Sequence, residues 1–202
     1  MESTVQYSLS RQPVFPSQTK KGWFNTNPPD SSELNWIEKF GKYPNFCAEG
    51  TSIKNRLRLE KANLKEATRI ILVYHYLHRG RTMAQLPYWI YIDNVPIGVI
   101  LFSYPRLSSS LFGIRPMNIL ELARLWISPD VQEKRIQIGN TSHALSIASC
   151  AVGKSLKILQ KDWYIKYPKS PDIRAVVSWA DDIHHEGIIY KAANFRSMKK
   201  SG

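Results

Sequence analysis

The chain has 202 residues, of which 28 are Lys or Arg and 16 are Asp or Glu, so its formal net charge is +12. Its composition, 43% hydrophobic and 22% charged, is typical of a single folded globular domain and excludes an intrinsically disordered chain. No apolar run approaches the roughly 20 residues of a membrane-spanning helix, and two cysteines are too few for a disulfide framework or a four-cysteine zinc site. We therefore expect a cytoplasmic protein that has no membrane partner and keeps both thiols reduced.

The excess positive charge is concentrated in residues 51–81, which hold eight basic and two acidic residues. Such a concentration favours a polyanionic partner, nucleic acid before a membrane surface, although a well-solvated protein surface has the same composition. The candidates for contacts with nucleic-acid phosphates are Lys61, Lys65, Arg69, Arg79 and Arg81.

The first 50 residues differ from the rest of the chain. Four prolines interrupt residues 1–32, and neither a helical nor a strand period runs through them. We therefore divide the chain into an irregular N-terminal arm over residues 1–50 and a folded domain over residues 51–202. Aromatic residues in the arm, such as Trp23 and Phe24, indicate that it packs on the domain or reaches toward a partner.

The first predicted helix is basic and amphipathic. Apolar residues recur at helical spacing over residues 64–74, directly after Asn63, which is a favourable N-cap. We expect this helix to run on through His75 and Tyr76 and to end at Gly80. A hairpin then follows, because two β-branched and aromatic runs, 88–92 and 97–102, flank the turn signal Asp93-Asn94.

Residues 119–127 predict a third strand that Pro129 ends. Strict alternation along it places Arg124 on the same face as Leu122 and Trp126. A polar loop then leads into a long helix, which we expect to begin at residues 139–142. The last predicted elements are a strand over residues 173–179 and a short helix over residues 188–193.

The order of these elements indicates a mixed sheet. Three consecutive strands favour antiparallel pairing, whereas the strand–helix–strand step across the long helix favours a parallel pair. The fold class is therefore α/β (α+β), with a mixed sheet flanked by helices. The sequence lacks a Gly-x-Gly-x-x-Gly motif after a strand, which argues against a Rossmann fold.

The expected start of the long helix is a candidate phosphate site, because backbone N–H groups and the helix dipole attract anions there. The loop resembles the one on which acetyltransferases of the GNAT superfamily hold the pyrophosphate of acyl-CoA. The alternative is a plain capped helix start. The candidate donor-binding residues are Arg135, Gly139, Asn140, Thr141 and Ser142.

The run from Asp181 to Phe195 gathers an acid, two histidines and a tyrosine just after a strand. Such groups can transfer protons or bind a metal, and sheet-strand ends are common places for sites. The alternative for any one of them is a helix cap or an ordinary surface residue.

Four segments of the chain resemble one known family. The segment His185-x-Gly187-x-Ile189-Tyr190-x-Ala192-x-Asn194-Phe195 is similar to the signature of Mom, a DNA-modification family of phages. In the same order as in that family stand His75-Tyr76, Glu121-Leu122-x-Arg124-Leu125-Trp126-Ile127-Ser128 and Asn140-Thr141-Ser142. The resemblance covers about residues 70–195.

This resemblance implies a GNAT-like transferase that converts the N6 amine of adenine in DNA to a carbamoylmethyl (or methylcarbamoyl) derivative and so protects phage DNA from restriction. It implies double-stranded DNA as partner, acyl-CoA or a related donor as cofactor, and action in the cytoplasm of a bacterial host. The candidate catalytic residues are Arg124, Asp181, Tyr190, His75 and Tyr76, and a mixed nitrogen and oxygen site for iron could be formed by His75, Tyr76, Asp181 and His185.

Two other functions fit the same sequence. One is a GNAT acyltransferase that acts on a protein amine or an aminoacyl-tRNA. The other is a nucleic-acid-binding module on a GNAT scaffold that has no catalytic activity. Fold alone does not choose between them, because the residues of the site determine function.

Overall fold

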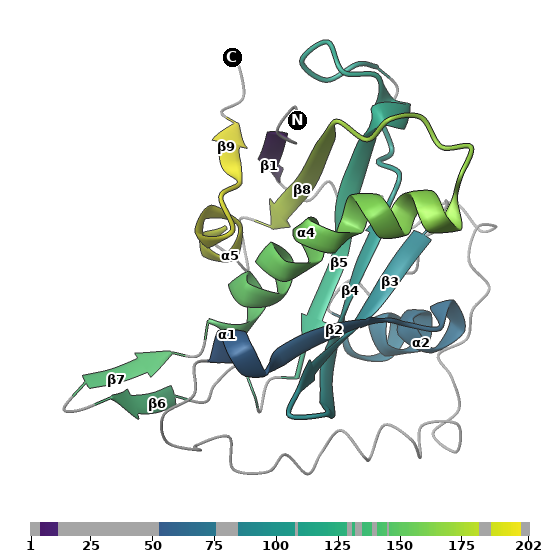
Figure 1. The fold of residues 1–202 in the computed structure, drawn as a ribbon. Helices are drawn as coiled ribbons and strands as arrows, with labels where there is room; N and C mark the ends of the chain where they lie inside the picture. Colours follow the sequence, from purple (N-terminus) through teal and green to yellow (C-terminus); the bar gives the residue numbers. More distant parts are fainter. Residues whose placement is uncertain are drawn as a thin grey trace, which may run out of the picture.

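A computed structural model describes residues 5–11, 53–75, 85–107, 109–128, 131, 135–138, 141–144, 146–181 and 187–198, with residues 5–11, 135–138 and 141–144 described by backbone alone. Its main sheet has seven strands in the order β2-β3-β4-β5-β8-β1-β9 (Figure 1). These strands are β1 (Val5–Arg11), β2 (Leu57–Lys61), β3 (Gln85–Ile92), β4 (Val95–Ser103), β5 (Ile119–Ile127), β8 (Ala175–Asp181) and β9 (Arg196–Met198).

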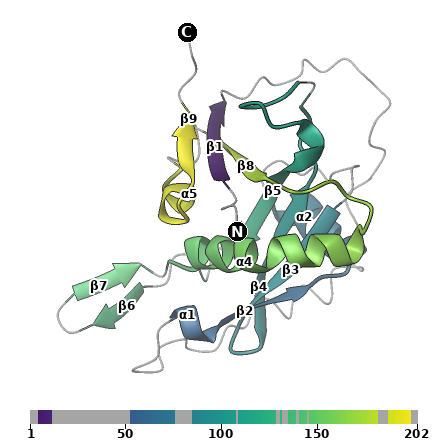
Figure 2. The same ribbon diagram turned by 45° about the horizontal axis from the view of Figure 1, so that its top comes forward.

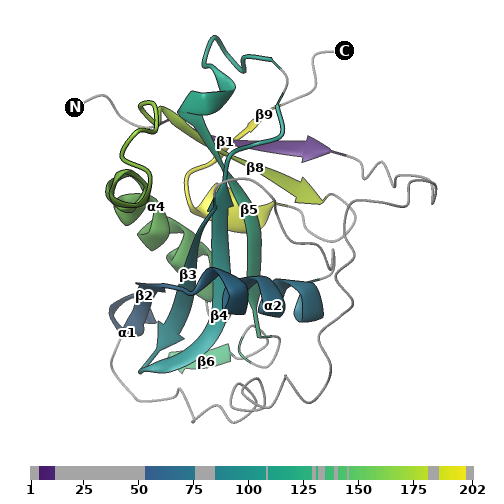
Figure 3. The ribbon, with the colours of Figure 1, turned by 90° about the vertical axis from the view of Figure 1, so that its right-hand side faces the viewer.

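Two helices cover the two faces of this sheet (Figure 3). The long helix α4 (Ile147–Lys166) packs on one face, where Val152, Leu159 and Trp163 join the main hydrophobic core with side chains of β3, β4 and β5. The shorter helix α2 (Leu64–Tyr74) packs on the other face, where Ile70 and Ile71 contact Trp89 and Val99. The predicted fold class, a mixed sheet flanked by helices, is confirmed.

The predicted hairpin and strand directions are also confirmed. The turn residues Asp93 and Asn94 both have positive φ, 48° and 67°, which is the conformation that two-residue hairpin turns favour. Strands β3, β4 and β5 are antiparallel neighbours, and β5 pairs in parallel with β8 after the crossover through α4. Asn63 caps α2 as predicted, since its side chain accepts a hydrogen bond of 2.9 Å from the N–H of Lys65.

A β-bulge in β5 overturns the predicted alternation. Leu101 pairs with Arg124 and Phe102 with Leu122, which leaves Ala123 as the extra residue. Leu122 consequently faces the α4 side, whereas Trp126 faces α2. Arg124, opposite Leu101, stands on the α2 side with Trp126, so Arg124 and Leu122 do not share a face as strict alternation predicted.

Strands β5 and β8 separate soon after they meet. They pair over only three positions, from Ile119 with Ala175 to Glu121 with Val177. Beyond these positions β5 continues to Ile127 and β8 to Asp181, with no further pairing between the two strands. Figure 1 shows this divergence of the two strands.

The structure differs from the prediction at the end of α2 and at the start of α4. Helix α2 ends at Tyr74 rather than Gly80, because His75 adopts an extended conformation. Helix α4 begins at Ile147 rather than at residues 139–142, because β6 (Arg135–Ile138) and β7 (Thr141–Ala144) form an antiparallel hairpin there. Ile138 pairs with Thr141, so Gly139-Asn140, a dipeptide that also favours hairpin turns, connects the two strands.

The arm is not irregular throughout. Residues 5–11 form β1, which lies between β8 and β9 and pairs in parallel with both (Figure 2). The sequence is consistent with this strand, because apolar Val5, Tyr7 and Leu9 alternate with polar residues before the first proline. The rest of the arm lies outside the described residues.

Strand β2, at one edge of the sheet, was not predicted. Polar contacts from α4 hold it: Lys154 Nζ donates to the carbonyl of Leu57 at 2.5 Å, and Lys61 Nζ lies 2.8 Å from the Asp162 carboxylate. The hydroxyl of Tyr88 on β3 donates to the same carboxylate at 3.1 Å. Burial, together with the charge and the hydrogen bond of Asp162, raises the pKa of Tyr88 far above its usual range.

We predict opposite effects for two glycine substitutions. A Cβ at Gly98 would overlap the backbone carbonyl of Trp126 and lie 2.9 Å from the Cα of Ile127, so Gly98→Ala should lower the free energy of unfolding by about 1–3 kcal/mol. A Cβ at Gly153, within α4, meets no described atom within 4 Å, so Gly153→Ala should raise it by about 0.5–1 kcal/mol. Urea unfolding of both variants tests this, and a neutral Gly98→Ala would contradict the close approach of β4 and β5.

Candidate functional site

The candidate site begins where β5 and β8 stop pairing. Leu122 and Ser178 directly follow the last paired residues of the two strands. The Ser178 hydroxyl donates to the carbonyl of Leu122 at 3.3 Å, and Ser178 is 1% exposed. A side chain therefore takes the place of the next backbone hydrogen bond between the strands, which a buried carbonyl requires.

Tyr190 reaches this point from the short helix α5 (Ile188–Ala192). Its hydroxyl is hydrogen-bonded to that of Ser178, and its ring packs edge-on against Phe195 with 5.6 Å between centroids. Gly187 (φ 67°) precedes the helix and Asn194 (φ 65°) follows it, so left-handed residues set the direction of the chain at both ends. The buried ring of Phe195 thus fixes that of Tyr190.

Burial raises the pKa of the Tyr190 phenol above its ordinary value, although the hydrogen bond with Ser178 and the charge of Arg124 act in the opposite direction. The phenol is therefore protonated at neutral pH. It can donate a hydrogen bond or a proton to a reacting group, but it is poorly suited to accept one.

Arg124 joins the site from β5, directly after the bulge. Its guanidinium is close enough to Tyr190 to favour the ionised phenol, and one of its nitrogens also donates to the carbonyl of Ala123. The residue is only partly buried. A guanidinium in this position can bind a carboxylate or a phosphate with two hydrogen bonds.

The structure brings together two of the predicted catalytic residues, Arg124 and Tyr190. His75 follows α2 and is buried, and its neighbour Tyr74 stacks on Trp126 of β5 at 5.0 Å between ring centroids. Asp181 ends β8, described by backbone alone. Tyr76 lies outside the described residues.

The predicted donor site is altered by the β6–β7 hairpin. Arg135 lies on β6, and Thr141 and Ser142 lie on β7. None of them opens a helix, so the helix dipole that was expected to attract a phosphate is not at these residues. Gly139 and Asn140 lie outside the described residues.

A metal centre stays a prediction. Within the part of the chain that the structure describes, no three His, Cys, Asp or Glu residues lie close enough to hold a metal ion. Of the four candidate ligands, only the His75 side chain belongs to that part, whereas Tyr76, His185 and the Asp181 carboxylate do not.

An ion pair within the molecule occupies one of the predicted nucleic-acid contacts. Lys61 pairs with Asp162, and two further cations of the same segment, Arg56 and Arg58, pair with Asp93 and Glu60. Lys65 is exposed at the start of α2, and Arg69 lies one turn further along the same helix. Arg79 and Arg81 lie outside the described residues.

Two residues were not singled out from the sequence. Ser178 is the one polar residue within residues 175–179, which are otherwise apolar. A hydroxyl at such a position indicates a buried polar group that has a specific hydrogen-bond partner. Glu121 is a carboxyl only 6% exposed in the middle of the sheet, opposite Ser103. Buried carboxyls are uncommon outside functional or paired positions.

A protein-family model described as the Mom protein family matches residues 56–201, which is most of the chain. The chain belongs to the Mom protein family. No curated protein is similar enough in sequence to match it.

Two solved structures are similar to this Mom-family chain in fold. An integron cassette protein from the mobile metagenome of the Cole Harbour salt marsh has 13% identity and a TM-score of 0.40, covering 78% of this chain and 91% of that one. A ribosomal-protein-alanine N-acetyltransferase from Brucella melitensis biovar Abortus 2308 has 13% identity and a TM-score of 0.39, covering 72% of this chain and 96% of that one.

Three of the segments that resemble the Mom signature lie within the described residues. Arg124 and Trp126 belong to β5, Tyr190 and Phe195 to α5 and the turn after it, and His75 directly follows α2. Among the described helices of this Mom-family domain, none is long and apolar enough to cross a membrane.

We predict that Ser178→Ala destabilises the site. The substitution removes a hydrogen bond from both the Leu122 carbonyl and the Tyr190 hydroxyl, so the free energy of unfolding should fall by about 1–3 kcal/mol. Ser149→Ala is the matched control, because its exposed hydroxyl bonds only to the carbonyl of Ser146 within the first turn of α4. Equal urea midpoints for the two variants would show that Ser178 does not support the separated strands.

Proposed function

We propose that this Mom-family chain is a transferase that modifies the N6 amine of adenine in double-stranded DNA, adding a carbamoylmethyl (or methylcarbamoyl) group. The observation that carries the proposal is the convergence of Arg124, Ser178 and Tyr190 where β5 and β8 separate. Two of these residues belong to the segments that resemble the Mom signature. Modified phage DNA in a bacterial cell would then resist restriction.

The chemistry requires three tasks of the protein. The lone pair of the adenine N6 amine is delocalised into the ring, so the amine is a weak nucleophile. Its nitrogen must form a bond to a carbon of the donor and lose one proton, while the donor's leaving group departs with the bonding electron pair. The site must therefore align the reactants, accept the amine proton and stabilise the departing charge.

Tyr190 and Arg124 are suited to stabilise the charge on the donor's leaving group. The neutral phenol of Tyr190 can donate a hydrogen bond to it, and the guanidinium of Arg124 can bind a carboxylate or phosphate of the donor. The proton of the amine needs a different acceptor, because the Tyr190 phenol is already protonated. Asp181, at the end of β8, is our candidate for that acceptor.

We propose acyl-CoA or a related molecule as the donor, as the resemblance implies. The hairpin at residues 135–144 does not offer the helix start on which a pyrophosphate was expected to bind. We therefore assign no step to a CoA group or to iron and keep the reaction to the groups of the described site.

The adenine must leave the base stack, because N6 is not accessible to these groups within a duplex. Trp179 on β8 is a candidate to receive it. Its indole is half-buried, and its N–H has no hydrogen-bond partner among the described residues. Trp126 is less suitable, because Tyr74 already stacks on it.

We predict that Arg124→Ala and Tyr190→Phe each lower DNA modification by about 10²-fold or more, because each removes a charge or hydrogen bond to the transition state. Mass spectrometry of nucleosides from DNA of cells that express the variants measures this. Lys157→Ala, at an exposed position on α4, is the control and should modify DNA as the unaltered chain does.

Thermal melting decides whether the two residues act in chemistry. Both variants should keep the melting temperature nearly unchanged. Large losses in melting temperature for both would instead assign them to the core. Unmodified DNA together with strong DNA binding by the unaltered chain would favour the non-catalytic module, and modification of a protein amine or an aminoacyl-tRNA would favour an acyltransferase.

A salt titration tests the contact of α2 with DNA. If Lys65 and Arg69 contact phosphates, Lys65→Ala/Arg69→Ala should weaken binding to all duplexes alike and make the log–log salt slope shallower by about 2. Lys157→Ala/Lys161→Ala, which removes two cations from α4 on the other face of the sheet, should leave the slope unchanged. Equal slopes for the two double variants would show that α2 does not bind DNA.

A further inference from the structure

Helix α2 ends in an aromatic side chain that is only partly covered. Tyr74 is the last residue of the helix and follows Ile70 by four residues and Ile71 by three, so it belongs to the apolar stripe that faces the sheet. Ile70 and Ile71 are completely buried, whereas Tyr74 is 41% exposed. No hydrogen bond between described residues involves its hydroxyl, and burial alone raises the pKa of the phenol. The ring is therefore the part of Tyr74 that makes contacts.

One face of this ring is fixed by the protein. Tyr74 stacks on Trp126 of β5, with 5.0 Å between the ring centroids and 22° between the ring planes. Before it reaches β5, the helix packs on Trp89 of β3 and Val99 of β4 (Figure 3). The stacked pair thus stands on β5, the strand that separates from β8 beyond its last pairing. Stacking orders the Tyr74 ring before any ligand binds, which lowers the entropic cost of a further contact.

The stacked pair lies on the same face of the sheet as two residues of the candidate site. Arg124 is on this face two residues before Trp126, opposite Leu101 of β4. Trp179 of β8 also points to this face, because it packs with Val177 and away from the core beneath α4. A ligand that contacts Tyr74 is thus on the side of the sheet from which Arg124 and Trp179 project.

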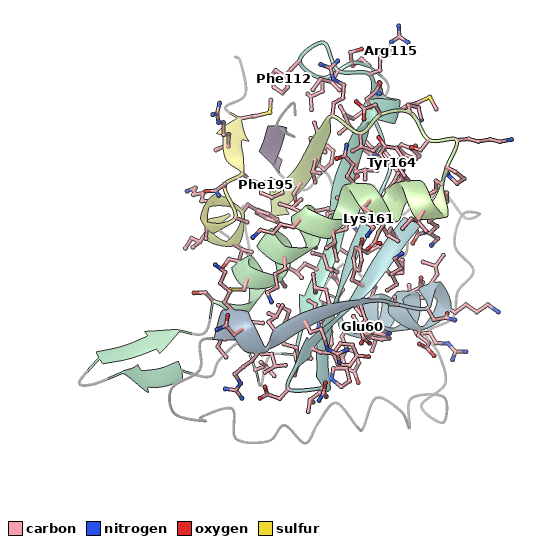
Figure 4. All side chains as sticks on the ribbon, in the orientation of Figure 1. Glu60, Phe112, Arg115, Lys161, Tyr164 and Phe195 are labelled. Atoms are coloured by element: carbon pink, nitrogen blue, oxygen red, sulfur yellow. The ribbon has the colours of Figure 1, made fainter. Side chains whose placement is uncertain are left out.

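The opposite face is filled by the protein itself. Phe195 is buried in the core beneath α4, and Tyr190 packs against the same core. Figure 4 shows Phe195 next to α4. Tyr190 therefore approaches the separated strands from the α4 side, and a large substrate must approach from the α2 side, where Tyr74 lies.

The spacing on the α2 side suits a nucleobase. Two residues along a strand span about 7 Å, which is roughly twice the distance between stacked bases. A base that stacks on Tyr74 therefore lies within reach of the Arg124 guanidinium. Lys65 is exposed about 14 Å away at the start of α2, where it can contact a phosphate of the strand that carries the base.

From these observations we infer that Tyr74, held against Trp126, is the stacking surface for the adenine that leaves the duplex. This inference rests on the proposed function and adds a substrate contact to it. Trp179 supplies a second aromatic contact to the same base from β8. Stacking tolerates every base, because each has an aromatic face, so Tyr74 holds the extruded base and does not select adenine.

The test uses the full chain and a synthetic duplex in which 2-aminopurine replaces each adenine in turn. This base is fluorescent when it is unstacked and is quenched when it stacks on an aromatic ring. At one position the complex with Tyr74→Leu should be brighter than the complex with the unaltered chain, because leucine fills the place of the ring without stacking. Modification of the unsubstituted duplex by Tyr74→Leu should fall about fivefold or more in kcat/KM.

Two variants separate the lost stacking from a lost fold. Tyr74→Phe keeps the ring and should match the unaltered chain in fluorescence, modification and melting temperature. Leu64→Ala changes an apolar side chain that is 37% exposed in the first turn of the same helix, and it should also leave fluorescence and modification unchanged. Arg124→Ala should keep the fluorescence of the unaltered complex although it no longer modifies DNA, because it does not remove the stacking surface.

The outcomes distinguish this inference from the proposed function. If Tyr74→Leu matches the unaltered chain in fluorescence at every position, Tyr74 stacks on no extruded base, and the inference is wrong while any modification measured still supports the transferase. If Tyr74→Leu is brighter at one position but the unaltered chain modifies no adenine, the stacking surface is correct and the transferase is wrong.

Discussion

The early separation of β5 and β8 is the constraint on which the site depends. Two adjacent strands that stop pairing leave backbone N–H and C=O groups that need other partners. Here the Ser178 hydroxyl takes the first of these positions by bonding to the carbonyl of Leu122. The same hydroxyl bonds to Tyr190, so the group that supports the separated strands also orients the phenol. Ser178 therefore both supports the separated strands and positions the side chain of the candidate site.

The bulge at Ala123 works together with this separation. By inserting one residue, it keeps Leu122 in the core beneath α4 and turns Arg124 to the opposite side. Without the bulge, a residue at the position of Arg124 would follow the alternation of Leu122 into the apolar core, where a guanidinium has no solvent. Arg124 on β5 is then near enough to Tyr190 on α5 for its charge to act against the raised pKa of the phenol.

Much of the fold could be predicted from local pattern, because the signals were strong and short in range. The capped apolar period of α2 and the Asp93-Asn94 turn between two aromatic strands each have a single structural interpretation. The Gly139-Asn140 dipeptide does not, since it suits a hairpin turn as well as a helix start, and the hairpin was the outcome. The bulge at Ala123 leaves no local signal, because it depends on the register with β4.

The candidate site shows the same contrast between local sequence signals and contacts that depend on distant segments. Arg124 and Tyr190 were singled out as candidates through short motifs, but nothing in those motifs names Ser178, which acquires its contact with Leu122 from a strand pairing that ends at Val177. The raised pKa of Tyr190 likewise comes from burial beneath neighbouring elements, which the sequence of α5 alone does not reveal. Roles that depend on contacts between distant segments require the three-dimensional structure.

The two ends of the sheet have a consequence for how the protein behaves at high concentration. An exposed edge strand can recruit strands of other molecules and so begin aggregation. Strand β2 carries Arg58, Glu60 and Lys61 within five residues, and Lys154 already occupies one of its carbonyls. At the opposite end β9 is only three residues long. Both edges are thus poor templates for further strands, so neither end of the main sheet favours growth by the addition of strands from other molecules.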